Sequence, residues 1–296
     1  MIRKFFLKCH RYVGLSLAAV LALLALSGSI LAFDPELDAL LNPELFDIDE
    51  VGGQALSPSE IAIRVEATDK RIKVRYIPLP GDVKKAIIVY VDSRINSSTR
   101  RPFDVSYDEV FVNPVTGAVL GDRMWGECCE RRNFVPFVFK FHNRLLMPSS
   151  TGRPVVGVIG ILWVLMTIVG IYLSLPEAGR KGRGLVRALV PRRGASGKFT
   201  SLQLHRAAGL WCSGVFILVA ISGAAIALDH QLFRPVVGVF SPITSTAWEE
   251  RAAASSGEGF DIAVSYDDAL AAAIEHAGSI VLATAASEIS YSEHRG

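Results

Sequence analysis

The sequence predicts a membrane all-α helical bundle that carries folded α+β modules outside the membrane. Three long stretches are apolar and contain no Asp, Glu, Lys or Arg, and basic residues gather in short segments beside them. The longer segments between them have the patterns of strands and short helices. The chain has 296 residues, half of them (50%) hydrophobic, and a mean hydropathy of +0.35, which is more apolar than a soluble domain needs.

The apolar stretches are Tyr12–Phe33, Pro154–Pro176 and Ala207–Leu228. A bilayer core needs roughly 20 apolar residues in helical form, so each stretch is long enough to span it. A cleaved signal peptide is the alternative for the first stretch, but no A-x-A-like cleavage site follows it. Because the third stretch repeats its pattern from mid-chain, we expect three spanning helices.

Charge predicts the orientation of these helices. The N-terminal "MIRKFFLKCHR" and the segment "EAGRKGRGLVRALVPRRGASGK" (177–198) are rich in Lys and Arg, and only one acidic residue lies in either. Short basic segments stay on the cytoplasmic side, so the N-terminus is expected there and the regions 34–153 and 229–296 on the far side. The net charge of +2 argues against a nucleic-acid partner.

The region after the first stretch has the signals of a small α+β module. "SPSEIAIRVEATD" begins a helix on Ser-Pro, and "RIKVRYIPL" and "AIIVYVDS" alternate as strands do. "DEVFVNPVTGAVLGDR" is a hairpin pattern. The last region starts similarly with "VSYDDALAAAIEHAGS", which predicts a second module of the same kind that stops early. A fourth spanning helix is expected after it and is absent from this chain.

These patterns divide the chain into six expected segments. They are the N-terminus with the first spanning helix (1–33), a soluble module (34–140), the second spanning helix (141–176), a basic cytoplasmic loop (177–204), the third spanning helix (205–229) and the start of a second module (230–296).

An internal repeat links the first and third stretches. At a constant offset of 195 residues, the second copy matches the first in His-Arg, Gly-Leu, Ser-Gly and Asp. The matched positions are His10-Arg11 with His205-Arg206, Gly14-Leu15 with Gly209-Leu210, Ser27-Gly28 with Ser222-Gly223, and Asp34 with Asp229. The chain is therefore expected to contain two units of helix plus outer module.

Four histidines lie at the ends of the apolar stretches. His10 and His205 hold equivalent repeat positions on the cytoplasmic side, while His142 and His230 lie on the outer side. Imidazoles from facing helices are ligands that haem iron takes for electron transfer, and 25 residues of helix span about 37 Å. One or two haems are expected on these histidines. Zinc is the weaker alternative, because no Cys or carboxylate is spaced to complete a tetrahedral site.

Three longer motifs resemble one family. They are "HRYVGLSLAAVLALLALSG", "FKFHNRLLMPSSTGRPVVGVIGILWVLMTIVGIYL" and "LHRAAGLWCSGVFILVAISG". They are similar to the PepSY-associated transmembrane helix family, and within it to bacterial inner-membrane ferric-siderophore reductases. "VFVNPVTGAVLG" and "SYDDALAAAIEHA" resemble the end and the start of PepSY modules. The resemblance covers nearly the whole chain.

The resemblance implies an inner-membrane bundle of four helices, periplasmic PepSY modules and b-type haem. It implies a reductase in iron uptake that reduces siderophore-bound ferric iron with electrons from a separate donor. By motif, the haem ligands fall on His10, His142 and His205. His230 lies outside the repeated motif, because Pro35 is its counterpart. No G-x-G-x-x-G follows a strand, so no flavin or nicotinamide site is expected.

Two other functions fit parts of the sequence. A membrane-tethered module that binds or regulates a periplasmic peptidase or signalling partner is compatible with the resemblance, but it gives no reason for the matched histidines. A metal permease is disfavoured, because no spanning stretch carries an Asp, Glu or His near its middle.

Overall fold

The structure is a computed structural model that describes residues 1–48, 52–79, 84–175, 188–191, 197–244, 264–281 and 288–290. The chain divides into two compact units. One comprises Met1–Ala32 with Phe139–Ile243, and the other comprises Phe33–Val138 with Thr244–Gly296.

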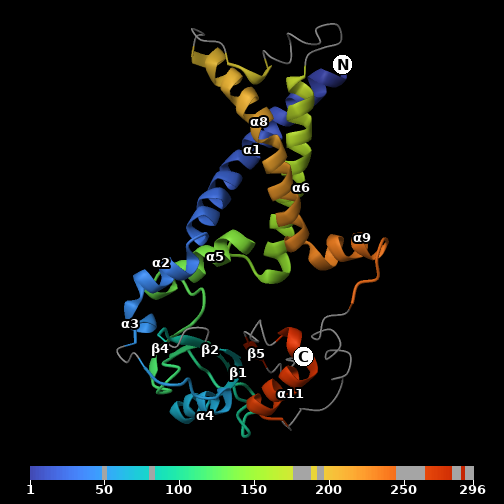
Figure 1. Cartoon of the computed structure of the whole chain (residues 1–296). Helices are drawn as coiled ribbons and strands as arrows, with labels where there is room; N and C mark the ends of the chain where they lie inside the picture. Colours follow the sequence, from blue (N-terminus) through green and yellow to red (C-terminus); the bar gives the residue numbers. More distant parts are fainter. Residues whose placement is uncertain are drawn as a thin grey trace. The chain divides into compact units, whose positions relative to one another are not determined.

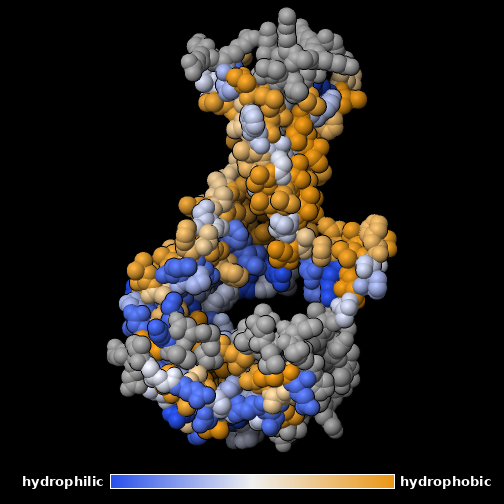
Figure 2. Space-filling view, in the orientation of Figure 1, coloured by the Kyte–Doolittle hydropathy of each residue, from blue (hydrophilic) through white to orange (hydrophobic). Residues whose placement is uncertain are grey.

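Three long helices build the first unit (Figure 1). They are α1 (Ile2–Leu31), α6 (Ser149–Ser174) and α8 (Gly197–Ala227). All three are long and apolar enough to cross a membrane, and hydrophobic residues cover much of their surface in Figure 2. The prediction of three spanning helices is confirmed, and the chain is a membrane helical protein with a lipid environment.

Small residues bring α6 close to α8. A Cβ added to Gly160 would lie 3.1 Å from the Cβ of Ala224, and one added to Gly157 would lie 2.4 Å from Cγ of Leu228. Without a hydrophobic drive between helices in lipid, such close approach supplies the packing that holds them together. The α6–α8 contact therefore depends on glycine at these two positions.

Two arginine side chains cap the C-terminal ends of helices in this unit. Arg3 donates to the carbonyl oxygens of Leu173 and Leu175 at the end of α6, at 2.7 and 3.3 Å. Arg153 donates to the carbonyl of Ile226 at the end of α8, at 3.0 Å. The last carbonyls of a helix have no intrahelical partner, so each long side chain satisfies a group that is costly to bury in lipid.

Two expected boundaries in this unit are wrong. The third spanning helix begins at Gly197 and not at 205, so its first turns occupy part of the expected loop 177–204; positions 176–187 and 192–196 of that loop lie outside the described residues. His142 does not open the second spanning helix, because it lies on the separate helix α5 (Phe134–Arg144). Helix α5 ends at Arg144, because Leu145 and Leu146 have positive φ angles of 52° and 61°, and Pro148 follows.

The second unit contains a five-stranded antiparallel sheet in the order β4-β3-β2-β1-β5. Its first four strands are β1 (Ile72–Pro78), β2 (Ile87–Ser93), β3 (Glu109–Val112) and β4 (Val119–Arg123). Helix α4 (Pro58–Thr68) precedes them and begins on a capping box between Ser57 and Glu60. The expected helix, strands and hairpin are present, so the α+β character of this region is confirmed.

The β3–β4 turn shows why the hairpin signal was specific. Oδ1 of Asn113 accepts hydrogen bonds from the backbone N–H groups of Val115 and Thr116, at 2.9 and 3.1 Å. Gly117 has a φ of 69°, a conformation that a residue with a Cβ rarely adopts. The Asn-Pro-x-Thr-Gly sequence thus supplies both the turn hydrogen bonds and the left-handed residue.

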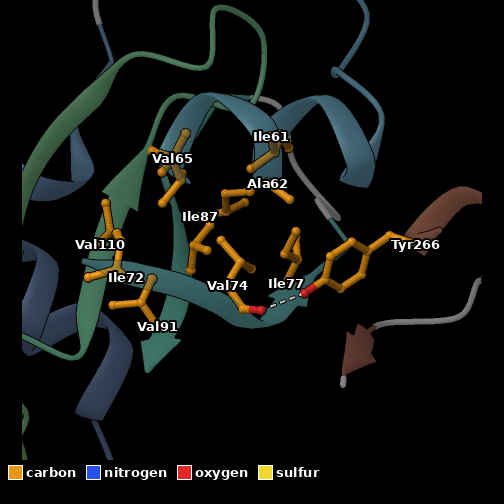
Figure 3. Close-up of a cluster of buried hydrophobic side chains, with 12 residues drawn as sticks. Ile61, Ala62, Val65, Ile72, Val74, Ile77, Ile87, Val91, Val110 and Tyr266 are labelled. Atoms are coloured by element: carbon orange, nitrogen blue, oxygen red, sulfur yellow. Dashed lines mark hydrogen bonds between the residues drawn. The ribbon is translucent and has the colours of Figure 1, made fainter. Parts of the chain in front are cut away.

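The last region of the chain joins this same sheet and core, which corrects the expectation of a second module over 230–296. Helix α11 (Tyr266–Val281) packs on α4, and β5 (Glu288–Ser290) pairs with β1. The ring of Tyr266 enters the core, and its hydroxyl donates to the carbonyl of Val74 at 2.9 Å (Figure 3). Residues from both regions therefore bury one shared apolar cluster.

A buried ion triad fixes the elements at the other side of the sheet. Arg123 on β4 donates to Glu109 on β3 at 2.6 Å and to Asp38 on α2 (Asp34–Leu41) at 3.0 Å. It also donates to the carbonyl of Arg132, at 2.8 Å, in the 3-10 turn η1 (Arg131–Asn133). Burial raises the pKa of Glu109, and the charge of Arg123 opposes that rise. The carboxylate is thus stabilised mainly by its arginine.

Arg123→Ala is expected to destabilise the sheet by roughly 3–5 kcal/mol, because it leaves two buried carboxylates without their cation. Hydrogen exchange of the β3 and β4 amides in the full chain measures the loss of protection. The matched control is Arg75→Ala, whose contact with Asp92 is exposed and 3.7 Å long, and which is expected to cost roughly 0.5 kcal/mol or less. Equal losses in the two variants contradict the role of the triad.

Candidate functional site

His10 is held against α6 by a glycine and a carbonyl group. A Cβ added to Gly170 would lie 3.0 Å from Cε1 of the imidazole, so the ring occupies the space that this glycine leaves. Nδ1 of His10 lies 3.1 Å from the carbonyl oxygen of Met166. Since a carbonyl only accepts, Nδ1 carries a proton and donates, which leaves Nε2 as the ring nitrogen that can act as an electron-pair donor.

The ring of His205, on α8, faces that of His10. The two ring centroids are 6.1 Å apart and the planes are inclined at 56°. Bonds between a metal ion and imidazole nitrogen are about 2 Å long, so two rings bound on opposite sides of one metal ion have centroids roughly 6 Å apart. The structure therefore brings together the two histidines that the repeat aligns, at a separation suitable for one shared metal ion.

Open space lies along the same helices one turn beyond this pair. Gly14 and Gly209 follow His10 and His205 by four residues, which places each on the same helix face as its histidine. Nothing lies within 4 Å of a Cβ added to either glycine. On each of the two helices, therefore, the position one turn from the histidine carries no side chain and borders open space.

The ring of His142 packs against the other end of α1. Its Nδ1 lies 3.0 Å from the carbonyl oxygen of Leu24 and 3.0 Å from Oγ of Ser27. A Cβ added to Gly28 would lie 2.9 Å from Cε1 of the ring. The carbonyl again requires the proton on Nδ1, so His142 also presents Nε2.

Comparison with known proteins identifies the family. A family profile described as "PepSY-associated TM region" matches residues 7–295. The chain belongs to the PepSY-associated TM family. No curated protein matches the chain.

In this PepSY-associated chain, His230 lies apart from the interhelical contacts described above. It is on the π-helical segment η2 (Asp229–Phe233), its side chain is 70% exposed, and Nε2 lies 3.8 Å from a carboxylate oxygen of Asp229. The expectation that His230 is a haem ligand stays a prediction. Among the residues that the structure describes, no three His, Cys, Asp or Glu side chains gather as metal ligands.

The residues that orient the histidines were missed by sequence reasoning. Met166 and Leu24 accept these hydrogen bonds through their backbone carbonyl groups. Every residue has such a group, so the residue type does not indicate this role. Gly170 occurs among many small and apolar residues of the second stretch and has no counterpart in the repeat. Gly28 is part of the repeated Ser-Gly pair, so its matched position was the one available signal.

Gly28→Val is expected to displace the imidazole of His142, because the new side chain occupies the volume of the ring. Acylation of His142 by diethyl pyrocarbonate, followed by peptide mass spectrometry, is expected to become faster. Gly14→Val is the control on the same helix, since its Cβ meets nothing within 4 Å. Unchanged acylation of His142 in Gly28→Val argues against the packing of the His142 ring on Gly28.

Proposed function

We propose that this chain is a haem-containing membrane reductase that passes electrons across the membrane to ferric iron bound by a siderophore. The observation that carries the proposal is the facing pair His10 and His205, with His10 oriented by the carbonyl of Met166. A histidine that donates from one ring nitrogen to a backbone carbonyl is the usual arrangement around a metal centre, because it fixes the tautomer and the ring orientation.

The residues present fit a haem. His10 and His205, two imidazoles on different helices with ring centroids 6.1 Å apart, would hold its iron. The open faces beside Gly14 and Gly209 leave room for a planar group. The surrounding helices are apolar, as the porphyrin body requires. His142, with its oriented Nε2, is the third proposed ligand, and His230 is retained as a fourth.

A haem held by His10 and His205 supplies one-electron redox chemistry. The chain's own residues hold and orient it: Met166 fixes the proton of His10 on Nδ1, and Gly170 sets the depth of the ring. The donor of electrons is proposed to be a separate molecule.

Two levels along α1 support a path that crosses the membrane. His10 lies near one end of the helix, and Ser27, which contacts His142, lies near the other. The separation of 17 positions between them spans roughly 25 Å of helix, most of a bilayer core. We therefore place one haem at each level, with the N-terminus cytoplasmic and the sheet-containing unit in the periplasm of a bacterial inner membrane.

His10→Ala and His205→Ala are each expected to remove the haem of the pair. The measurement is the haem-to-protein ratio of purified full-length protein, together with the single-turnover oxidation of the pre-reduced protein by a ferric siderophore. Ser222→Ala is the comparison on α8, because the Ser222 hydroxyl donates to the carbonyl of Val219 of its own helix, at 3.0 Å, and is not among the proposed ligands. Retention of the full ratio by both His10→Ala and His205→Ala is incompatible with the proposal.

Gly209→Leu is expected to abolish haem binding at the pair while leaving the helices intact, because the new side chain fills the open face beside His205. Gly214→Leu is the matched control: its Cβ also meets nothing within 4 Å, but it lies on a different face of α8. Absorbance at the Soret band reports binding, and circular dichroism reports helix content. Equal haem content in the two variants contradicts the proposed location.

A further inference from the structure

The chain changes direction where α8 ends. The helix stops at Ala227, the π-helical segment η2 follows, and α9 (Arg234–Gly238) leads away from α8 (Figure 1). Backbone hydrogen bonds from Phe240 and Ser241 to Val237 extend the helical turns past α9. One short helical segment, Asp229–Ser241, therefore follows the spanning helix directly.

This segment has an apolar stripe that the helical unit does not cover. Five of its large apolar side chains recur at helical spacing and are exposed, and Figure 2 shows apolar surface over α9. They are Leu232 (42%), Phe233 (46%), Val236 (49%), Val239 (79%) and Phe240 (85%). Spacings of one, three and four residues place these side chains along one face of a helix.

The position of the segment along the membrane normal follows from its neighbours. Leu228 fills the space at Gly157 of α6, so the start of the segment is fixed to the spanning helices. The charged residues Asp229 and Arg234 come next, 3.9 Å apart, and charged groups are costly inside the bilayer core. A segment of this length is too short to span, so it begins at the boundary of the bilayer.

We propose that Asp229–Ser241 lies in the plane of the membrane surface, with its apolar stripe in the lipid at the boundary between headgroups and acyl chains. The partner is the bilayer itself, because α8, which is apolar enough to span it, carries exposed apolar side chains up to Ile226, three residues before the segment begins. Amphipathic helices with aromatic and aliphatic residues on one face lie in this way. The segment then fixes the depth and rotation of α8 and so of His205, independently of haem.

The test places an environment-sensitive fluorophore on the stripe of the full chain in phosphatidylcholine vesicles. The variants Phe240→Cys and Gln231→Cys are labelled with a nitrobenzoxadiazole dye after replacement of the four native cysteines by Ala or Ser. At 3.6 residues per turn, Gln231 lies on the opposite side of the helix from Phe240. We expect blue-shifted emission at position 240, quenched more by lipids with a nitroxide at acyl carbon 5 than at carbon 12.

Four results overturn the proposal. Water-like emission at position 240 without lipid quenching shows that the stripe is in solvent. Stronger quenching from carbon 12 shows that the segment is in the bilayer core. Blue-shifted emission without lipid quenching shows that protein covers the stripe, either from another part of the chain or from a second copy. Equal quenching at positions 231 and 240 also contradicts a segment with one lipid-facing side.

Discussion

Close contact between a histidine ring and a glycine of a neighbouring helix is the constraint on which the helical unit depends. His10 occupies the space at Gly170, and His142 occupies the space at Gly28. Each ring also donates to a backbone carbonyl of that neighbouring helix, at 3.1 Å from Met166 and 3.0 Å from Leu24. A histidine that packs in this way has its proton fixed on Nδ1 and a defined direction for Nε2. The packing of the helices and the orientation of the two imidazoles therefore depend on the same contacts.

The two copies of the repeat use the same residues differently. Their histidines, His10 and His205, meet across the unit. Ser27 and Ser222 both donate to the carbonyl three residues earlier on their own helix. The Ser-Gly pairs diverge in their other contacts, because Ser27 and Gly28 contact His142 whereas nothing lies within 4 Å of a Cβ added to Gly223. At one end of the bundle, therefore, the equivalent histidines of the two copies lie together. At the other end, the Ser-Gly pair of the first copy contacts a histidine from α5.

Sequence patterns predicted those features that a short stretch of chain determines by itself. The spanning helices follow from uncharged apolar length, and the β3–β4 turn follows from the hydrogen bonds of Asn113 and the φ of Gly117. The pairing of β5 with β1 was not predicted, because it joins strands far apart in the chain and depends on a shared core. The position of His142 was missed for a different reason: the break at Leu145 and Leu146 separates α5 from the spanning helix.

In the candidate site too, the sequence predicted some features, and others depend on contacts between distant parts of the chain. Matched positions in the repeat identified His10 and His205 as a pair, because a duplicated sequence folds into equivalent helices. Carbonyl partners depend on which helix lies alongside, and that depends on tertiary packing.

The most direct test of a haem-bearing histidine pair is the reduced-minus-oxidised visible spectrum of the purified full-length protein from haem-replete cells. Two imidazoles on one iron give a low-spin centre, so the account predicts a Soret band and a sharp α-band in the reduced protein, both weakened by His10→Ala. A correctly folded protein without a Soret band, or with a spectrum that His10→Ala and His205→Ala leave unchanged, would contradict it.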